Sequence, residues 1–142
     1  MNLVDANVLL YAVNTDAPHH EASRRWLDDS LSGAATVGFA WLPLLAFLRL
    51  VTKSELFPSP LTPAQAFDRV DAWLSSPAAV IVEPTARHAS LVRGFLEEVG
   101  SGGNLVNDAH LAALSVEHGG RVVSFDRNFA RFSGVELLTP GD

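Results

Sequence analysis

Short runs of apolar residues alternate along the chain with longer segments in which apolar residues recur at helical spacing. The short runs predict strands at residues 2–5, 35–38, 80–82, 122–125 and 135–138. The longer segments predict helices at residues 6–13, 17–31, 41–52, 63–75, 85–99 and 107–118. Loops rich in proline or glycine separate several of these elements, at residues 58–63 and 100–103.

The predicted strands are short and apolar on both faces, and they alternate with helices. This pattern is typical of a parallel sheet that is covered by helices on both sides. The sequence therefore predicts an α/β fold, a three-layer sandwich around a mostly parallel sheet of about five short strands. With 142 residues, no internal repeat and no linker-like segment, the chain is expected to form one domain, residues 1–142.

Two helix starts and one unusual helix are visible in this pattern. Asp16 with Pro18, and Thr62 with Pro63, provide the polar cap and early proline that are typical of a helix start. The segment 41–52 is apolar on nearly every side. It is therefore expected to be either a deeply buried helix or one that lies partly in an interface.

Composition and charge narrow the chemistry. Cysteine is absent, which excludes disulfides, zinc thiolate sites and cysteine nucleophiles, so any metal must be held by oxygen ligands or histidine. The net charge of −6 argues against a nonspecific nucleic-acid binder with a basic surface. The amino terminus lacks the basic region of a signal peptide, and the longest apolar run, residues 37–48, is too short to span a membrane. A cytoplasmic protein without membrane contact is expected.

Three aspartates occur where sheets of this kind bind ligands, beyond the carboxyl ends of the strands. Asp5 follows the first predicted strand and Asp126 follows the fourth. Asp108 lies in the first turn of its predicted helix, after Asn104 and Asn107, either of which could cap that helix. A single aspartate in such a place is usually a turn or cap residue, whereas three at one edge of a sheet indicate a site.

Carboxylates that lie close together raise one another's pKa unless a cation neutralises them. Mg²⁺ suits such a site, because it prefers oxygen ligands, binds one or two carboxylates and keeps several waters. A bound divalent cation lowers the pKa of a water molecule and stabilises charge on a phosphoryl oxygen. The three aspartates therefore predict hydrolysis by a metal-activated water.

Three segments resemble motifs of the PIN-domain ribonucleases, and in particular of the VapC-type toxins of bacterial toxin–antitoxin pairs. They are residues 3–10 (LVDANVLL), 104–113 (NLVNDAHLAA) and 124–132 (SFDRNFARF). Their order, spacing and extent cover essentially the whole chain. The resemblance implies a PIN-like fold and endonucleolytic cleavage of RNA. It also implies a VapB-like antitoxin as a partner and a homodimer.

The resemblance further implies roles for individual residues. Asp5, Asp108 and Asp126 would be the catalytic residues and would hold Mg²⁺ or Mn²⁺. Four other residues would orient metal ligands, water or substrate: Asn7, Asn104, Asn128 and Arg127.

One position departs clearly from the family pattern. The family usually carries a glutamate on the central apolar helix, where this chain has Ala46, and no acidic residue occurs between residues 30 and 54. Asn128 is a second departure, because an additional acid often occurs there. The site could therefore hold one metal or two, with Asn104, Asp16 or water completing the ligands.

Histidine and arginine residues near these segments allow more than one interpretation. His110 is close to Asp108 along the helix, where a packing role is favoured over a chemical one. Arg49, Arg127 and Arg131 are candidates for phosphate contact, because guanidinium groups bind phosphate well. Surface ion pairing is the alternative for each of them.

Two alternative functions remain open from the sequence. A signalling receiver domain is also a single α/β domain with an acidic Mg²⁺ pocket, but it needs a lysine at the end of a late strand. The only lysine is Lys53, in a helix-rich region. The second alternative is a degenerate PIN module that binds RNA or protein without cleaving, and the missing glutamate motivates it.

Overall fold

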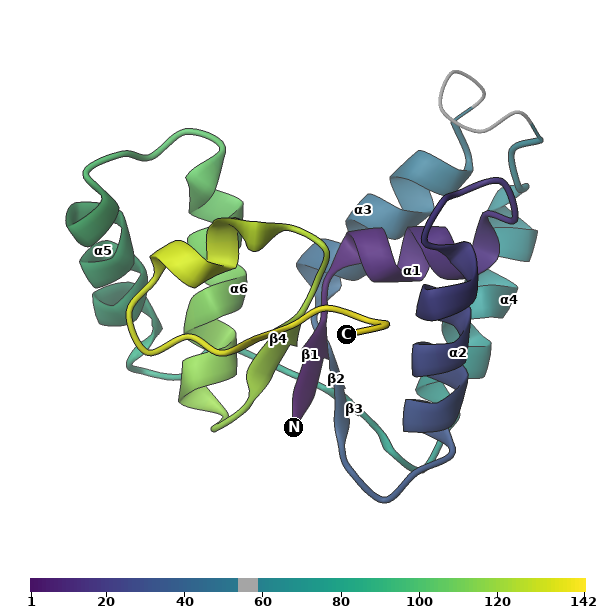
Figure 1. The fold of residues 1–142 in the computed structure, drawn as a ribbon, viewed down its shortest axis with the longest axis horizontal. Helices are drawn as coiled ribbons and strands as arrows, with labels where there is room; N and C mark the ends of the chain where they lie inside the picture. The colour runs from purple at the N-terminus through teal and green to yellow at the C-terminus, as the bar shows by residue number, and fades with distance from the viewer. Residues whose placement is uncertain (54–58) are drawn as a thin grey trace.

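A computed structural model describes residues 1–53 and 59–142 of the chain. Its strands are β1 (Asn2–Val4), β2 (Val37–Phe39), β3 (Ala79–Ile81), β4 (Arg121–Val123) and β5 (Leu137–Leu138). Its helices are α1 (Ala6–Val13), α2 (His20–Leu31), α3 (Trp41–Val51), α4 (Pro63–Leu74), α5 (His88–Val99) and α6 (Leu105–Glu117), with a 3-10 helix η1 (Arg127–Arg131). Every predicted strand and helix therefore has a counterpart (Figure 1).

The strands form one sheet in the order β3-β2-β1-β4-β5, and every pairing among the described residues is parallel. β1 lies in the middle, where Leu3 is opposite Gly38 of β2 on one side and Val122 of β4 on the other. Because parallel strands end at the same edge, the segments that follow β1, β2 and β4 come together there. The predicted α/β fold with a parallel central sheet is confirmed.

Helices cover both faces of this sheet, as Figure 1 shows. On one face, α1 to α4 bury a core that includes Phe39 of β2, Phe47 of α3 and Trp73 of α4. On the other face, α5, α6 and η1 pack on Leu3 and Val122. Burial on both faces explains why β1 and β4 are apolar after their first residues, Asn2 and Arg121.

Two helix starts differ from their predictions. Asp16 does not cap α2, because residues 15–19 form a turn and the helix begins only at His20. α6 begins at Leu105, two residues before the predicted start, and the Asn104 side chain at the cap position makes no capping hydrogen bond. Asn107 lies inside the helix and does not cap it either.

The start of α4 and the edge of the sheet give one confirmation and one correction. Thr62 Oγ1 accepts a hydrogen bond from Gln65 N at 3.2 Å, and Gln65 Oε1 accepts one from Thr62 N, so the predicted cap is confirmed. The prediction that every strand is buried on both faces is wrong for β3. Its residues Val80 and Ile81 are 42% and 40% exposed, because β3 lies at the edge of the sheet.

Of the predicted loop 58–63, residue 58 lies outside the described residues. Within the described ranges, no helix is long and apolar enough to cross a membrane.

Phe47→Ala is expected to lower the free energy of unfolding by about 3–5 kcal/mol, because it leaves a cavity in a fully buried part of the core. Phe67→Ala is the matched control, since it removes the same atoms from an α4 side chain that is 47% exposed. The control is expected to cost less than about 1 kcal/mol. Urea unfolding followed by circular dichroism measures both, and equal losses would contradict the described packing of α3.

Candidate active site

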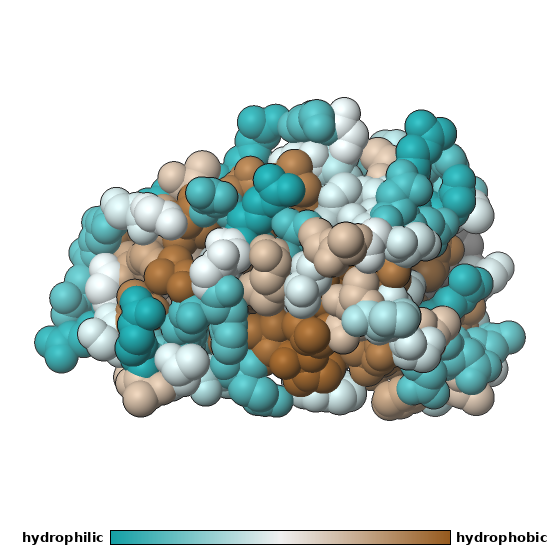
Figure 2. Space-filling model, turned by 90° about the horizontal axis from the view of Figure 1, so that it is seen from below, coloured by the Kyte–Doolittle hydropathy of each residue, from teal (hydrophilic) through white to brown (hydrophobic). Residues whose placement is uncertain are grey.

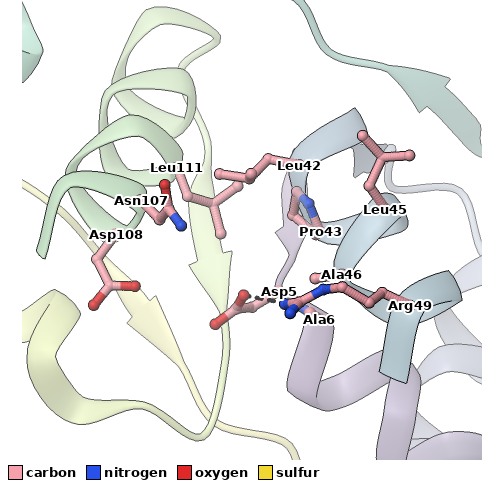
Figure 3. Close-up of a pocket in the computed structure, with 10 residues that line it drawn as sticks. All are labelled: Asp5, Ala6, Leu42, Pro43, Leu45, Ala46, Arg49, Asn107, Asp108 and Leu111. Carbon is pink, nitrogen blue, oxygen red and sulfur yellow. Dashed lines mark hydrogen bonds between the residues drawn. The ribbon is translucent and has the colours of Figure 1, made fainter. Parts of the chain in front are cut away.

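A pocket of about 320 Å³ opens beyond the carboxyl end of β1, between α3 and α6 (Figure 3). Its lining residues come from three separate parts of the chain: Asp5 and Ala6; Leu42, Pro43, Leu45, Ala46 and Arg49; and Asn107, Asp108 and Leu111. Figure 3 shows the carboxylates of Asp5 and Asp108 pointing toward each other across the pocket. The fold thus brings together two of the three predicted acids.

Asp5 is held firmly between β1 and α1. Its backbone N–H donates to Val123 O at 3.0 Å, which continues the pairing of β1 with β4. Its side chain caps α1, with Oδ1 accepting from Ala6 N at 2.8 Å. The other carboxylate oxygen, Oδ2, accepts from Ser124 Oγ at 2.7 Å. Both oxygens are therefore oriented before any ligand binds.

Ser124 connects the segments around the site, and the sequence did not single it out. β4 ends at Val123, one residue before it, so Ser124 lies at the carboxyl edge and not inside the strand as predicted. Its buried hydroxyl donates to Asp5 and accepts from Asn7 Nδ2 and from Asp126 N, each at 3.0 Å. A serine directly after an apolar strand and two residues before an aspartate was the available signal.

Asp108 is less constrained than Asp5. Its carboxylate makes no hydrogen bond to any side chain or backbone group in the described part of the chain. Burial, followed by the negative charges of Asp126 and Asp5, raises the pKa of Asp108 to about 6. Burial also raises the pKa of Asp5, with hydrogen bonds from Ser124 and Ala6 opposing and the charge of Asp126 adding to the increase. The three acids therefore interact electrostatically.

Asp126 is near the other two acids but does not line the pocket. It caps η1, and its Oδ1 accepts from Asn128 N at 2.9 Å. Among residues 1–53 and 59–142, no three acidic or histidine side chains are already close enough to hold one metal ion. The arrangement offers two facing carboxylates, and the charge of Asp126 is close enough to act on both.

This donor set fits a hard divalent cation. Mg²⁺ needs few protein ligands, since one or two carboxylates with several waters complete its shell. Asp5 and Asp108 supply such carboxylates, and their raised pKa values show that each would gain from a neutralising charge. Ala46, at the position where a family member would carry glutamate, lines the pocket with a methyl group only.

The remaining predicted site residues occupy different surroundings. Asn7 is part of the hydrogen-bonded network, because its Oδ1 also accepts from Phe125 N at 3.3 Å. Asn104 and Asn128 are exposed and do not line the pocket. Arg127 is exposed as well and lines a different hollow, beside Phe125. Arg49, by contrast, lines the same pocket as Asp5 and Asp108.

His110 contributes to a buried polar connection between α5 and α6. Its Nδ1 lies 2.8 Å from His88 Nε2, and His88 Nδ1 lies 2.6 Å from Glu117 Oε2. Burial raises the pKa of Glu117, but hydrogen bonds from Thr85 and His88 outweigh burial and leave the pKa below its ordinary value. An ionised Glu117 only accepts, so His88 Nδ1 donates to it. The expected packing role of His110 thus includes a hydrogen bond that anchors α6.

Comparison with known proteins identifies the class. The family model for the PIN domain matches residues 3–135, so the fold and site define a PIN domain. Ribonuclease VapC37 of Mycobacterium tuberculosis is 61% identical over 140 residues, covering 99% of this chain and 97% of the relative. Ribonuclease VapC31 of the same species is 40% identical and covers 99% of each. The chain belongs to the VapC family of PIN-domain ribonucleases.

Solved structures agree with the fold. VapBC2 from Rickettsia felis, bound to a DNA fragment from its promoter, has a TM-score of 0.72 at 20% identity and covers 98% of both chains. VapC20 from Mycobacterium tuberculosis, a Sarcin-Ricin loop cleaving toxin, has a TM-score of 0.69 at 17% identity, covering 96% of this chain and 99% of that one. At these identities the likeness supports the α/β architecture alone.

The raised pKa of Asp108 predicts a pH-dependent stability for the metal-free protein. The pKa of about 6 in the folded protein lies above the ordinary aspartate pKa of 3.8, so the protonated carboxyl favours folding. This contribution is present below about pH 4 and is lost as the pH rises through 6. Asp108→Asn stays neutral at every pH. Its melting temperature in EDTA should therefore exceed that of the wild type by more at pH 7.5 than at pH 5.

Asp68→Asn, on the exposed surface of α4, is the matched control for this comparison. Thermal unfolding followed by circular dichroism at the two pH values measures all three proteins. An Asp108→Asn offset that is the same at pH 5 and pH 7.5 would contradict the described surroundings of this carboxyl.

Proposed function

We propose that this VapC-family protein is a divalent-metal-dependent endoribonuclease and the toxin of a toxin–antitoxin pair. The observation that carries the proposal is the pair of facing carboxylates, Asp5 and Asp108, in a pocket at the carboxyl edge of the sheet. RNA as the substrate is supported by the ribonuclease names of relatives that align over nearly the whole chain. Such a substrate implies that the protein acts in the cytoplasm.

Asp5 and Asp108 would hold Mg²⁺ or Mn²⁺, and Asp126 would act from behind them through its charge or through a bound water. When bound, the cation lowers the pKa of a water and stabilises charge on the phosphate oxygens. Hydrolysis by that water would break a phosphorus–oxygen bond of the RNA and add one water across it, the oxygen going to phosphorus and a proton of the water going to the leaving oxygen. Ser124 keeps Asp5 Oδ2 oriented throughout, and Asn7 keeps Ser124 in place.

The pocket favours one cation over two. Only two carboxylates line it, and Ala46 adds no ligand from the α3 side. A second divalent ion would need further oxygen ligands, because each cation has to be partly neutralised to be held. Asn104 and Asp16 do not line the pocket, so water completes the shell in this proposal.

A VapB-like antitoxin is the proposed protein partner, because the VapBC structures with the same fold combine toxin and antitoxin. Trp41 and Leu45 on α3 are 43% and 56% exposed, and Leu45 lines the pocket, so this helix offers apolar docking surface next to the site. Exposed Val80 and Ile81 on the edge strand β3 support the proposed homodimer. Figure 2 shows that patches of hydrophobic surface are exposed between hydrophilic side chains on the face seen from below.

The two alternatives fare differently. A receiver domain is contradicted by the family match, and Lys53 follows α3 and not a late strand. A PIN module that binds without cleaving stays an outcome of the activity test.

Asp5→Asn and Asp108→Asn are each expected to slow RNA cleavage in Mg²⁺ or Mn²⁺ by more than about 100-fold. Loss of outer partners of metal ligands alone costs about 10- to 100-fold, and these changes would remove the ligands themselves. Asp71→Asn makes the same chemical change on the exposed face of α4 and should cleave at the wild-type rate. Gel analysis of a labelled RNA measures the rates, and circular dichroism checks folding.

Cleavage by Asp5→Asn at the wild-type rate would contradict the assigned site. RNA binding by the wild-type protein without turnover in either metal would favour the non-cleaving module.

A further inference from the structure

Arg49 is the one basic residue among those that line the pocket. It lies on α3, opposite the wall that Asp108 forms from α6. Figure 3 shows its side chain extending from α3 across the pocket mouth toward Asp5. An acidic protein with a net charge of −6 therefore presents a guanidinium beside its two pocket carboxylates.

The Arg49 guanidinium has no partner in the described part of the chain: it forms neither a hydrogen bond nor an ion pair there. Arg24 and Arg93 pair with glutamates on their own helices and Arg121 donates to Asn2 Oδ1, whereas four further arginines also have no partner among the described residues but lie outside this pocket. Ala46, one helical turn before Arg49, lines the same pocket but offers only a methyl group. The surface ion pairing that is the usual role of an arginine is therefore absent.

The two walls of the pocket carry opposite charges with space between them. No carboxylate oxygen of Asp5 or Asp108 comes within ion-pair distance of Arg49. A ligand that completes this arrangement must carry anionic oxygens, which a guanidinium binds in bidentate fashion, and must also tolerate the apolar side chains between the walls. A phosphodiester with its attached sugars has these properties.

We propose that Arg49 binds the scissile phosphate of the RNA and is a substrate-positioning residue of this site. The inference rests on the proposed ribonuclease function and deepens it. A polyanion that approaches Asp5 and Asp108 meets repulsion, and Arg49 supplies the opposing attraction from the other wall. Because a pocket of about 320 Å³ has room for little more than one nucleotide, the phosphate held by Arg49 is the one presented to the carboxylates.

Binding without metal tests this role independently of cleavage. The probe is a 5′-fluorescein-labelled, 20-nucleotide single-stranded RNA of random sequence, titrated in EDTA by fluorescence anisotropy at several KCl concentrations. Arg49→Ala should weaken binding about 10- to 100-fold, the usual worth of a charge-assisted hydrogen bond. It should also reduce the slope of log affinity against log salt by about 0.7, the value for one phosphate contact on a single strand.

Arg49→Lys keeps the charge but loses the bidentate geometry, so it should retain the salt slope and recover only part of the affinity. Arg25→Ala is the matched control. It removes one positive charge from α2, where the side chain is 71% exposed and pairs with Glu21, and it should change neither affinity nor slope.

Ala46→Glu provides a second test, because it leaves Arg49 in place and gives the guanidinium a carboxylate partner one turn away. In EDTA it should weaken RNA binding as Arg49→Ala does. Wild-type affinity and salt slope in both Arg49→Ala and Ala46→Glu would overturn the inference. If the wild-type protein fails to cleave RNA in Mg²⁺ and Mn²⁺, the proposed function fails, while the EDTA comparison still decides whether Arg49 contacts phosphate.

Discussion

The candidate site requires the fold to hold negatively charged carboxylates close together at one edge of a parallel sheet. Asp5 and Asp108 face each other across the pocket, and the negative charge of Asp126 acts on both. Each carboxylate would be more stable in water and farther from the others. The sheet prevents this separation, because β1 is paired on both sides and Asp5 follows it directly. Packing on both faces of the sheet therefore supplies the free energy that the acidic site costs.

The two pocket carboxylates are held in different ways. Asp5 has a hydrogen bond to each oxygen, from Ala6 and from Ser124, so its orientation is fixed by the chain itself. Asp108 has no such bond to residues 1–53 or 59–142, and its position depends on how α6 is placed. The connection from Glu117 through His88 to His110, two residues after Asp108, ties α6 to α5. One fixed and one adjustable carboxylate would suit the proposed cation, whose shell would change as substrate binds.

The sequence pattern that predicted a parallel sheet also predicted the two carboxylates at the carboxyl edge of that sheet. Asp5 directly follows β1, and Asp108 lies in the first turn of α6, so short-range pattern and the carboxyl-edge rule were sufficient for both. Ser124 and Arg49 needed the structure, because their roles depend on contacts between segments far apart in the sequence. Asn104 was predicted as a site residue because it is close to Asp108 along the chain. Its side chain is exposed and does not line the pocket.

Ala46 contributes no carboxylate to the pocket, and Arg49 has no partner among the residues that the structure describes. These two features are consistent with each other, because fewer metal charges would then face the phosphate and a guanidinium would supply part of the missing positive charge. The proposed site is therefore a mixed one, in which the carboxylates of Asp5 and Asp108 would hold a metal cation and the guanidinium of Arg49 would hold the phosphate.

The most direct test is a crystal structure of the wild-type protein soaked in Mn²⁺, with anomalous scattering recorded to locate the metal. The account predicts a single strong anomalous peak between the carboxylates of Asp5 and Asp108, within coordination distance of both. A peak elsewhere in the molecule, or these two carboxylates turned away from each other with no metal between them, would contradict it.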